Sequence, residues 1–228
     1  MTMQRKIYRG TPVIINDERI DPARMARAWV KDEMREIRAN MLSMASANQP
    51  GEKGWFVLQV VSGREKAVEN LLREKGVMSY LPLVQGGVKM VRGHKVRSPE
   101  RPAFAGYVMV SVVPSAAAFA GLVSVRNVED ILGGAQKPHR VSDETMSRFK
   151  IMLGDWAEAT ARAKDFNKGD WVEFDEGPFA GFKGHIVKLR KMVLIRGEKP
   201  VAVEGVVEVD IGGRVSSVTT PLALLVKL

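Results

Sequence analysis

The chain has 228 residues, of which 45% are hydrophobic, enough to form the core of one or two domains. It contains no cysteine, which excludes disulfides and thiolate metal sites. The formal net charge of +9 suggests an anionic partner, although an excess of this size is also common as a device for solubility. No stretch approaches the roughly 20 apolar residues of a membrane span, and the N-terminus lacks the apolar core of a signal peptide. We therefore expect a soluble, cytoplasmic protein.

The positive charge is concentrated in the middle of the chain. Residues 54–153 carry 14 basic and 8 acidic side chains, whereas residues 165–228 carry nine of each. Any polyanion is therefore expected to meet the middle segment.

Residues 1–53 form an N-terminal extension with one predicted amphipathic helix. Asp21 suits the N-cap position and Pro22 the first helical position. Apolar residues then recur at three- and four-residue steps: Ala26, Val30, Met34, Ile37, Met41 and Met44. Two interpretations stay open, a helix packed on its own protein and a helix that docks on a partner. The stretch "ASANQPGEKG" then indicates a linker.

Residues 54–153 have the pattern of a small α+β domain. "GWFVLQVV" is typical of a buried strand, and "REKAVENLLREKG" of a helix that ends at Gly76. Extended runs, a short helix at "PSAAAFAGLVS" and a last strand at "VRNVEDILGG" complete a β-α-β-β-α-β order. We expect an antiparallel sheet covered by helices on one face.

The C-terminal part is predicted to be a small β-barrel on a tether. Ser142 caps a helix whose tail supplies a helical or flexible linker at residues 154–164. Residues 165–228 then contain about five short strands separated by Gly and Pro, which favours a closed barrel without open edges.

The sequence lacks the usual signatures of an enzyme. Its three histidines have no metal-like spacing to other ligands, and no nucleophile elbow occurs. In "EGPFAGFKGHIV" the lysine precedes the last glycine and no Ser or Thr follows, so a phosphate-binding loop is excluded. We predict no catalytic residue, no metal and no cofactor.

Four segments, in order, resemble the NusG family of transcription elongation factors. "GWFVLQVVSGREKAVENLL", "SPERPAFAGYVMV" and "VRNVEDILGG" resemble its N-terminal (NGN) domain, and "KGDWVEFDEGPFAGFKGHIVKL" resembles the KOW motif of its SH3-like C-terminal barrel. The resemblance covers Gly54 to Leu228, and residues 1–53 lie outside it. Ala105 stands where the family favours proline.

The resemblance implies a function in transcription elongation, termination and antitermination. The NGN-like domain at 54–153 would bind the clamp helices of RNA polymerase and suppress pausing. The KOW domain at 165–228 would recruit a second protein, either Rho or a small-subunit ribosomal protein. The free protein would be monomeric.

The resemblance also implies which residues make these contacts. The polymerase-binding residues would be Trp55, Phe104, Gly106 and Tyr107. A basic hairpin with Arg92, Lys95, Arg97 and Arg101 would approach the DNA and RNA of the elongation complex, because such a hairpin neutralises phosphates without reading sequence. The KOW partner-binding residues would be Phe179, Phe182 and Lys183, with Phe182 as the anchor and Phe179 closer to the core. For the aromatic residues burial in their own core, and for the hairpin a solvated loop, remain open.

Two alternatives to a general elongation factor remain. A specialised paralogue, carried by a phage or acting on selected operons as an antiterminator, is favoured by the extension and by extra residues around "RKMVLIRGEKPVAVEG". A KOW-type ribosomal RNA-binding protein would need positive charge on the barrel, whose charges balance.

Overall fold

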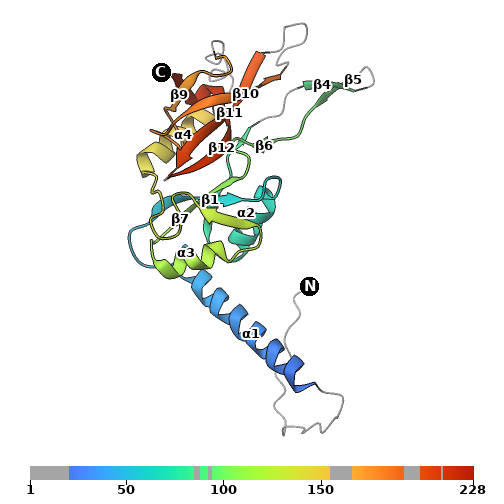
Figure 1. The fold of residues 1–228 in the computed structure, drawn as a ribbon, viewed down its shortest axis with the longest axis vertical. Coiled ribbons are helices and arrows are strands. Elements are labelled where there is room, and N and C mark those ends of the chain that lie inside the picture. Colours follow the sequence, from blue (N-terminus) through green and yellow to red (C-terminus); the bar gives the residue numbers. More distant parts are fainter. Residues whose placement is uncertain (1–20, 85–87, 92–93, 155–165, 193–200, 212) are drawn as a thin grey trace. The chain divides into compact units, whose positions relative to one another are not determined.

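The computed structural model describes residues 21–84, 88–91, 94–154, 166–192, 201–211 and 213–228. The chain divides into two compact units, Met1–Ile37 and Arg38–Leu228. Figure 1 shows its elements in sequence colours. Among the described helices, none has the length and apolarity needed to cross a membrane.

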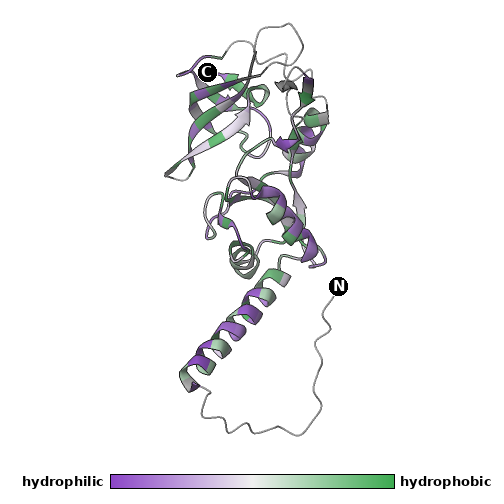
Figure 2. Cartoon of the chain, turned by 90° about the vertical axis from the view of Figure 1, so that its right-hand side faces the viewer, coloured by the Kyte–Doolittle hydropathy of each residue, from purple (hydrophilic) through white to green (hydrophobic). Residues whose placement is uncertain are grey.

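The first unit contains most of helix α1 (Pro22–Ser43). Its start agrees with the predicted cap, because the backbone N–H of Ala23 donates to Oδ1 of Asp21 over 2.9 Å. Large apolar side chains along α1 are exposed: Met25, Trp29, Val30, Met34 and Ile37. Figure 2 shows α1 with both hydrophilic and hydrophobic residues along its length.

The last turn of α1 belongs to the second unit and packs closely there. Leu42 is buried, and a Cβ built on Gly121 of helix α3 (Ala116–Val123) would lie 2.5 Å from the backbone nitrogen of Leu42. Only glycine permits so close an approach of the two helices. The C-terminal end of α1 is therefore fixed to the second unit, and the predicted linker follows this helix end in the chain.

The N-terminal sheet is antiparallel and has the strand order β2-β7-β1-β8. Its strands are β1 (Gly54–Val60), β2 (Met78–Tyr80), β7 (Tyr107–Val112) and β8 (Val128–Ile131). The register pairs Trp55 with Ser111 and Gln59 with Tyr107, which places Trp55 and Tyr107 on one face, because side chains alternate along a strand.

Helices cover the other face of this sheet, as predicted. Helix α2 (Glu65–Glu74) and α3 pack against β1 and β7 through a buried cluster that includes Phe56, Val68 and Phe119. Helix α2 is followed by Gly76 at a φ of +71°, which fits the predicted helix end. In Figure 1, α3 lies below β1 and β7, whereas helix α4 (Asp143–Gly154) lies above them.

The sequence predicted a covered face on one side of this sheet, and the structure shows that the second face is buried as well. The face with Trp55 and Tyr107 packs against Met146 and Phe149 of α4 and against residues of the C-terminal sheet, in one buried cluster. Local sequence patterns gave no sign of this contact, because a face that meets another module has the same apolar alternation as one that meets a helix.

In the described parts of the chain between β2 and β7 there are four short strands. They form two pairs, β3 (Leu83–Val84) with β6 (Arg101–Pro102), and β4 (Val88–Val91) with β5 (His94–Arg97). The β4–β5 pair is the predicted basic hairpin, and Arg92 at its turn lies outside the described residues.

The C-terminal sheet has five antiparallel strands in the order β12-β11-β10-β9-β13, which confirms the predicted strand number. The strands are β9 (Trp171–Phe174), β10 (Lys183–Met192), β11 (Val201–Ile211), β12 (Arg214–Pro221) and β13 (Leu225–Lys227). A short 3-10 helix, η2 (Leu222–Leu224), joins the last two. The predicted linker at 154–164 falls, from residue 155 onward, outside the described residues.

Candidate protein and nucleic-acid binding surfaces

Three of the predicted polymerase-binding side chains gather on the sheet face that opposes α2 and α3. Trp55, Phe104 and Tyr107 belong to the same buried cluster, and the exposed fractions of their side chains are 6%, 0% and 3%. We call these three side chains the aromatic face. The fold therefore brings together three side chains that are far apart in the chain, and their role in binding polymerase stays a prediction.

The turn before β7 positions this aromatic face. Gly106 has a φ of +86°, and its N–H donates to Oε1 of the buried Glu65 over 2.8 Å. Its carbonyl accepts from the N–H of Val60 over 2.8 Å. Gly106 thus acts through its backbone, which fixes the turn that carries Phe104 and Tyr107.

The electrostatic surroundings of the aromatic face are set by burial and by one lysine. Burial, with a smaller contribution from the negative charge of Glu129, raises the pKa of Tyr107 to about 12. Nζ of Lys150, on α4, lies 4.4 Å from the ring centre of Trp55 and 5.0 Å from that of Tyr80. This cation–π contact joins α4 to the sheet, and sequence analysis missed it.

Phe179 of the C-terminal sheet's first loop packs directly on the aromatic face. Its ring centre lies 5.1 Å from that of Phe104 and 5.0 Å from that of Tyr107, the latter in an edge-to-face geometry. Phe179 is fully buried, and it also lies 5.6 Å from Phe174 of its own sheet. It belongs to the core, as the sequence analysis favoured, and this core is shared between the two sheets.

Glycines in the same loop allow this approach. Gly177 has a φ of +91°, and an added Cβ would lie 3.2 Å from Cδ2 of Phe149 and 3.5 Å from Cζ of Phe104. Gly181 has a φ of +84°, and the loop ends at Lys183, where β10 begins. The chain therefore turns at both glycines, and the turn at Gly177 lies against the aromatic face.

Phe182 and Lys183 occupy the edge of the loop. Phe182 is partly buried, and its ring lies 4.9 Å from the imidazole of His139 in an edge-to-face geometry. Burial lowers the pKa of His139. Nζ of Lys183 lies 3.5 Å from Oε2 of Glu173, in an exposed pair that contributes little to stability.

Arg101 is paired with a carboxylate of the C-terminal sheet. Its guanidinium lies 2.5 Å from Oε1 of Glu204, whose side chain is 1% exposed, while that of Arg101 is 27% exposed. Lys95 and Arg97 lie on β5. Sequence analysis missed Glu204 because its partner comes from a distant part of the chain.

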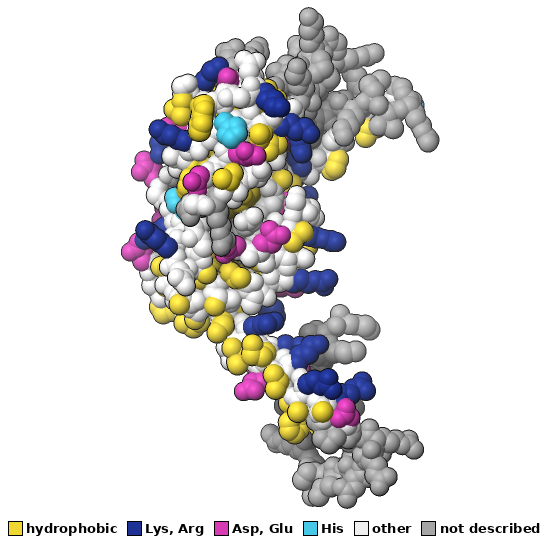
Figure 3. Space-filling model, viewed as in Figure 1, with side chains coloured by type: hydrophobic (Ala, Val, Ile, Leu, Met, Phe, Trp, Pro, Cys, Tyr) yellow, Lys and Arg dark blue, Asp and Glu magenta, His cyan; other side chains and the backbone are white. Residues whose placement is uncertain are grey.

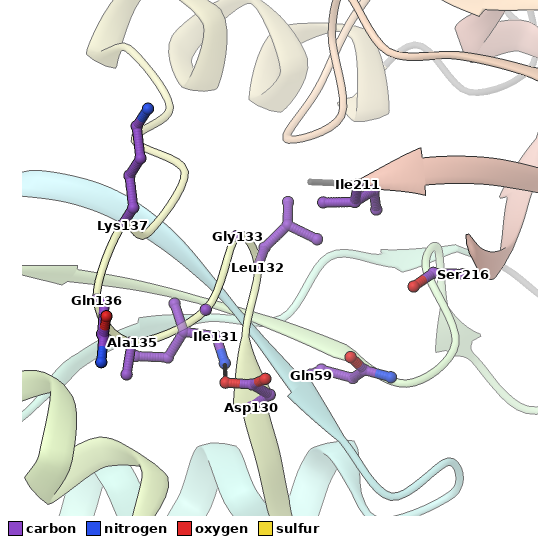
Figure 4. A pocket seen from close by; sticks show the side chains of 11 residues that line it. Gln59, Asp130, Ile131, Leu132, Gly133, Ala135, Gln136, Lys137, Ile211 and Ser216 are labelled. Carbon is purple, nitrogen blue, oxygen red and sulfur yellow. Dashed lines mark hydrogen bonds between the residues drawn. The ribbon is translucent and has the colours of Figure 1, made fainter. Parts of the chain in front are cut away.

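A cleft of about 390 Å³ lies beside the contact between the sheets. Figure 4 shows Gln59 and Asp130 on one side of it and Ile211 and Ser216 on the other. Within the described ranges, no group of acidic or histidine side chains could hold a metal ion. We interpret the cleft as a gap at the edge of the contact between the two sheets.

The described residues form an α+β part with a four-stranded antiparallel sheet and an all-β part with a five-stranded antiparallel sheet. The family described as "Transcription termination factor nusG" matches residues 53–150. The "Transcription termination/antitermination protein NusG" of Pasteurella multocida (strain Pm70) is 33% identical over 144 residues, which cover 59% of this chain and 78% of that protein. The protein of the same name from Escherichia coli (strain K12) is 30% identical over 141 residues, or 58% and 78%.

A solved structure, "Domain interaction in Thermotoga maritima NusG", shares 23% identity over 78% of this chain and 98% of that chain, with a TM-score of 0.40. The identity to these relatives and the share of their length that is covered show that the chain belongs to the NusG family of transcription termination and antitermination factors. The members of this family are not enzymes.

Proposed function

We propose that this protein is a transcription elongation factor that binds RNA polymerase through the aromatic face and suppresses pausing. The observation that carries the proposal is the convergence of Trp55, Phe104 and Tyr107 on one sheet face, within the segment that matches the family. Such side chains give large contact areas at small entropic cost, which suits them to a helical partner such as the polymerase clamp.

We further propose that the other two predicted surfaces serve the same complex. The β4–β5 hairpin, with Arg92, Lys95 and Arg97, would neutralise phosphates of the nearby nucleic acid. The loop that carries Phe182 and Lys183 would bind a second protein, either Rho or a small-subunit ribosomal protein. Balanced charge in residues 165–228 supports a protein partner for this module over an RNA partner.

A specialised paralogue is the second candidate. One observation favours it: α1 precedes the segment that matches the family, and several of its large apolar side chains are exposed. Exposed apolar side chains of this kind suit a contact surface additional to the segment that matches the family. Figure 3 shows these hydrophobic side chains beside Lys and Arg side chains on α1.

Binding to core RNA polymerase tests the main proposal. The full chain, labelled with a fluorophore, is titrated with the polymerase, and Tyr107→Ala is compared with Phe119→Ala. Both positions are buried aromatics, but Phe119 lies in the cluster between the sheet and its own helices. Tyr107→Ala should weaken binding at least about tenfold more than Phe119→Ala. Equal effects, or no binding by the unsubstituted chain, would refute the proposal.

Transcription in vitro separates the two candidates. On templates without special sequence elements, a general factor should speed elongation and alter Rho-dependent termination. A specialised paralogue should act only on templates that carry its own recruitment element.

Charge reversal at Arg92, Lys95 and Arg97 together should reduce pause suppression most at low salt, because phosphate contacts weaken as salt rises.

A further inference from the structure

Helix α1 carries its basic and acidic side chains on different sides. Successive residues of an α-helix lie about 100° apart around its axis, and on this geometry four cations of α1 share an arc of about 80°. They are Arg24, Arg27, Lys31 and Arg35. The acidic residues Asp32, Glu33 and Glu36 fall outside that arc. We call the four cations the basic stripe, and Figure 3 shows Lys and Arg side chains gathered along one side of α1.

The basic stripe is open to solvent. Residues 23–40 are all exposed, and the side chains of Arg27 and Arg35 are 78% and 66% exposed. Arg27 lies 4.0 Å from Asp21, and Arg35 lies 2.8 Å from Asp32, in surface pairs of little strength. Neither Arg24 nor Lys31 forms an ion pair with another described residue. The stripe can therefore be reached by a ligand.

The spacing of the basic stripe acts against the helix itself. Arg24 and Arg27 are three residues apart, and Arg27, Lys31 and Arg35 follow one another at steps of four. Like charges at these spacings are neighbours on the helix surface and destabilise it. A helix that needed its charges only for solubility would intersperse the two signs. An anionic partner that neutralises the stripe accounts for the arrangement.

We propose that the basic stripe binds the phosphate backbone of double-stranded DNA. The stripe is a straight row about 16 Å long, and along that length a duplex of about five base pairs presents phosphates to all four side chains. Three of the four are arginines, whose planar guanidinium can donate two parallel hydrogen bonds to one phosphate. Contacts of this kind hold DNA without reading its sequence.

The other side of α1 favours a duplex over a single strand. Proteins that bind single-stranded nucleic acid place aromatic side chains among their cations, so that bases stack on them. The aromatic residue of α1 is Trp29, which is 69% exposed but lies about 160° around the helix from Lys31. A stiff duplex also meets a straight row of cations without the ordering that a flexible strand would require.

The inference goes beyond the proposed function. Helix α1 precedes residues 53–150, which match the family, and the basic stripe is separate in the chain from the β4–β5 hairpin. The stripe would therefore add a second, sequence-independent hold on nucleic acid. It requires no contact with polymerase.

Salt-dependent DNA binding tests the proposal. A fluorescent duplex of about 25 base pairs is titrated with the full chain, without polymerase, between about 50 and 200 mM salt, and binding is followed by anisotropy. The test variant is Arg24→Gln with Lys31→Gln, because glutamine favours a helix about as well as lysine and arginine do. Lys168→Gln with Lys188→Gln is the matched control, since it removes the same charge from exposed positions in residues 165–228.

The test variant should bind at least about tenfold more weakly at the lowest salt, and its slope of log K against log salt should be smaller by about 1.8, because each lost phosphate contact removes about 0.9. The control should keep the slope of the unsubstituted chain. An unchanged slope in the test variant, or an equal change in the control, would overturn the inference.

Two further measurements locate the contact and identify the nucleic acid. Hydrogen exchange in α1 of the unsubstituted chain should slow when duplex DNA is added, and unchanged exchange there would refute binding at the stripe. The substitutions should weaken binding to duplex DNA more than to single-stranded DNA or double-stranded RNA of the same length. Equal losses on these probes would refute the choice of duplex DNA. Because polymerase is absent from every assay, failure of the proposed function would leave these results unaffected.

Discussion

Removing either partner of the Arg101–Glu204 pair should have unequal consequences for stability. Arg101→Gln leaves a carboxylate that is 1% exposed without its cation, and loss of one partner of a buried pair costs about 3–5 kcal/mol. Glu204→Gln leaves a guanidinium that is already 27% exposed and can turn toward water. Glu204→Gln should therefore lower the free energy of unfolding by at most the value of one charge-assisted hydrogen bond, about 1.5–3 kcal/mol. Arg101→Gln should therefore be the more damaging change.

Urea unfolding of the full chain, with the double variant included, measures this asymmetry. The double variant should cost less than the sum of the single ones, with a coupling energy of about 0.5–3 kcal/mol. Native-state hydrogen exchange in β6 and β11 is a second readout, since it also detects separation of the sheets before unfolding. Equal costs below about 0.5 kcal/mol for both single variants, with unchanged exchange, would refute the idea that a buried ion pair holds the sheets together.

Three further predictions concern titration and close packing. Burial lowers the pKa of His139 from its ordinary value of 6.5. As the pH falls below 6.5, the unfolded chain therefore takes up the proton before the folded chain does, and the stability of the fold should decline. In urea unfolding, His139→Phe should flatten this decline, and an unchanged pH profile would contradict it. Absorbance titration should show Tyr107 ionising with a pKa of about 12, and the stability of the fold should fall above about pH 10, where the tyrosine of the unfolded chain ionises first. Tyr107→Phe should remove this loss of stability at high pH. A pKa near 10 would refute the burial of Tyr107. Gly121→Ala should lower the free energy of unfolding, measured in urea, by about 1–3 kcal/mol, because the added Cβ would meet the backbone of Leu42. This is expected even though alanine favours a helix over glycine by about 1 kcal/mol. A stabilised variant would show that the two helices separate freely.

Much of the fold followed from local physical signals in the sequence. Asp21 and Ser142 accept hydrogen bonds from the first turns of α1 and α4, as expected of N-caps. The nearly continuous apolar run in "GWFVLQVV" predicts a buried strand, and the side chains on both faces of β1 are buried. Such features depend on neighbouring residues, so a single sequence contains enough information to find them.

The contact between the modules could not be found in this way. Arg101 has the sequence context of a solvated hairpin cation, and nothing near it in the chain indicates Glu204 as a partner. Phe179 could be assigned to a core from its loop, but not to a core that Phe104 and Tyr107 share. Pairings between distant segments depend on how two completed modules meet, which periodicity within one segment does not encode.

The shared core also changes how the three predicted surfaces relate to one another. If they were independent, the affinity for polymerase would depend only on the aromatic face, and substitutions in the C-terminal sheet would leave it unchanged. Because Phe179 packs on Phe104 and Tyr107, and Glu204 pairs with Arg101, a change at Phe179 or Glu204 also alters the surroundings of residues predicted to bind other partners. The effects of substitutions at Phe179 and Tyr107 are therefore expected to be non-additive, because the two rings are in direct contact.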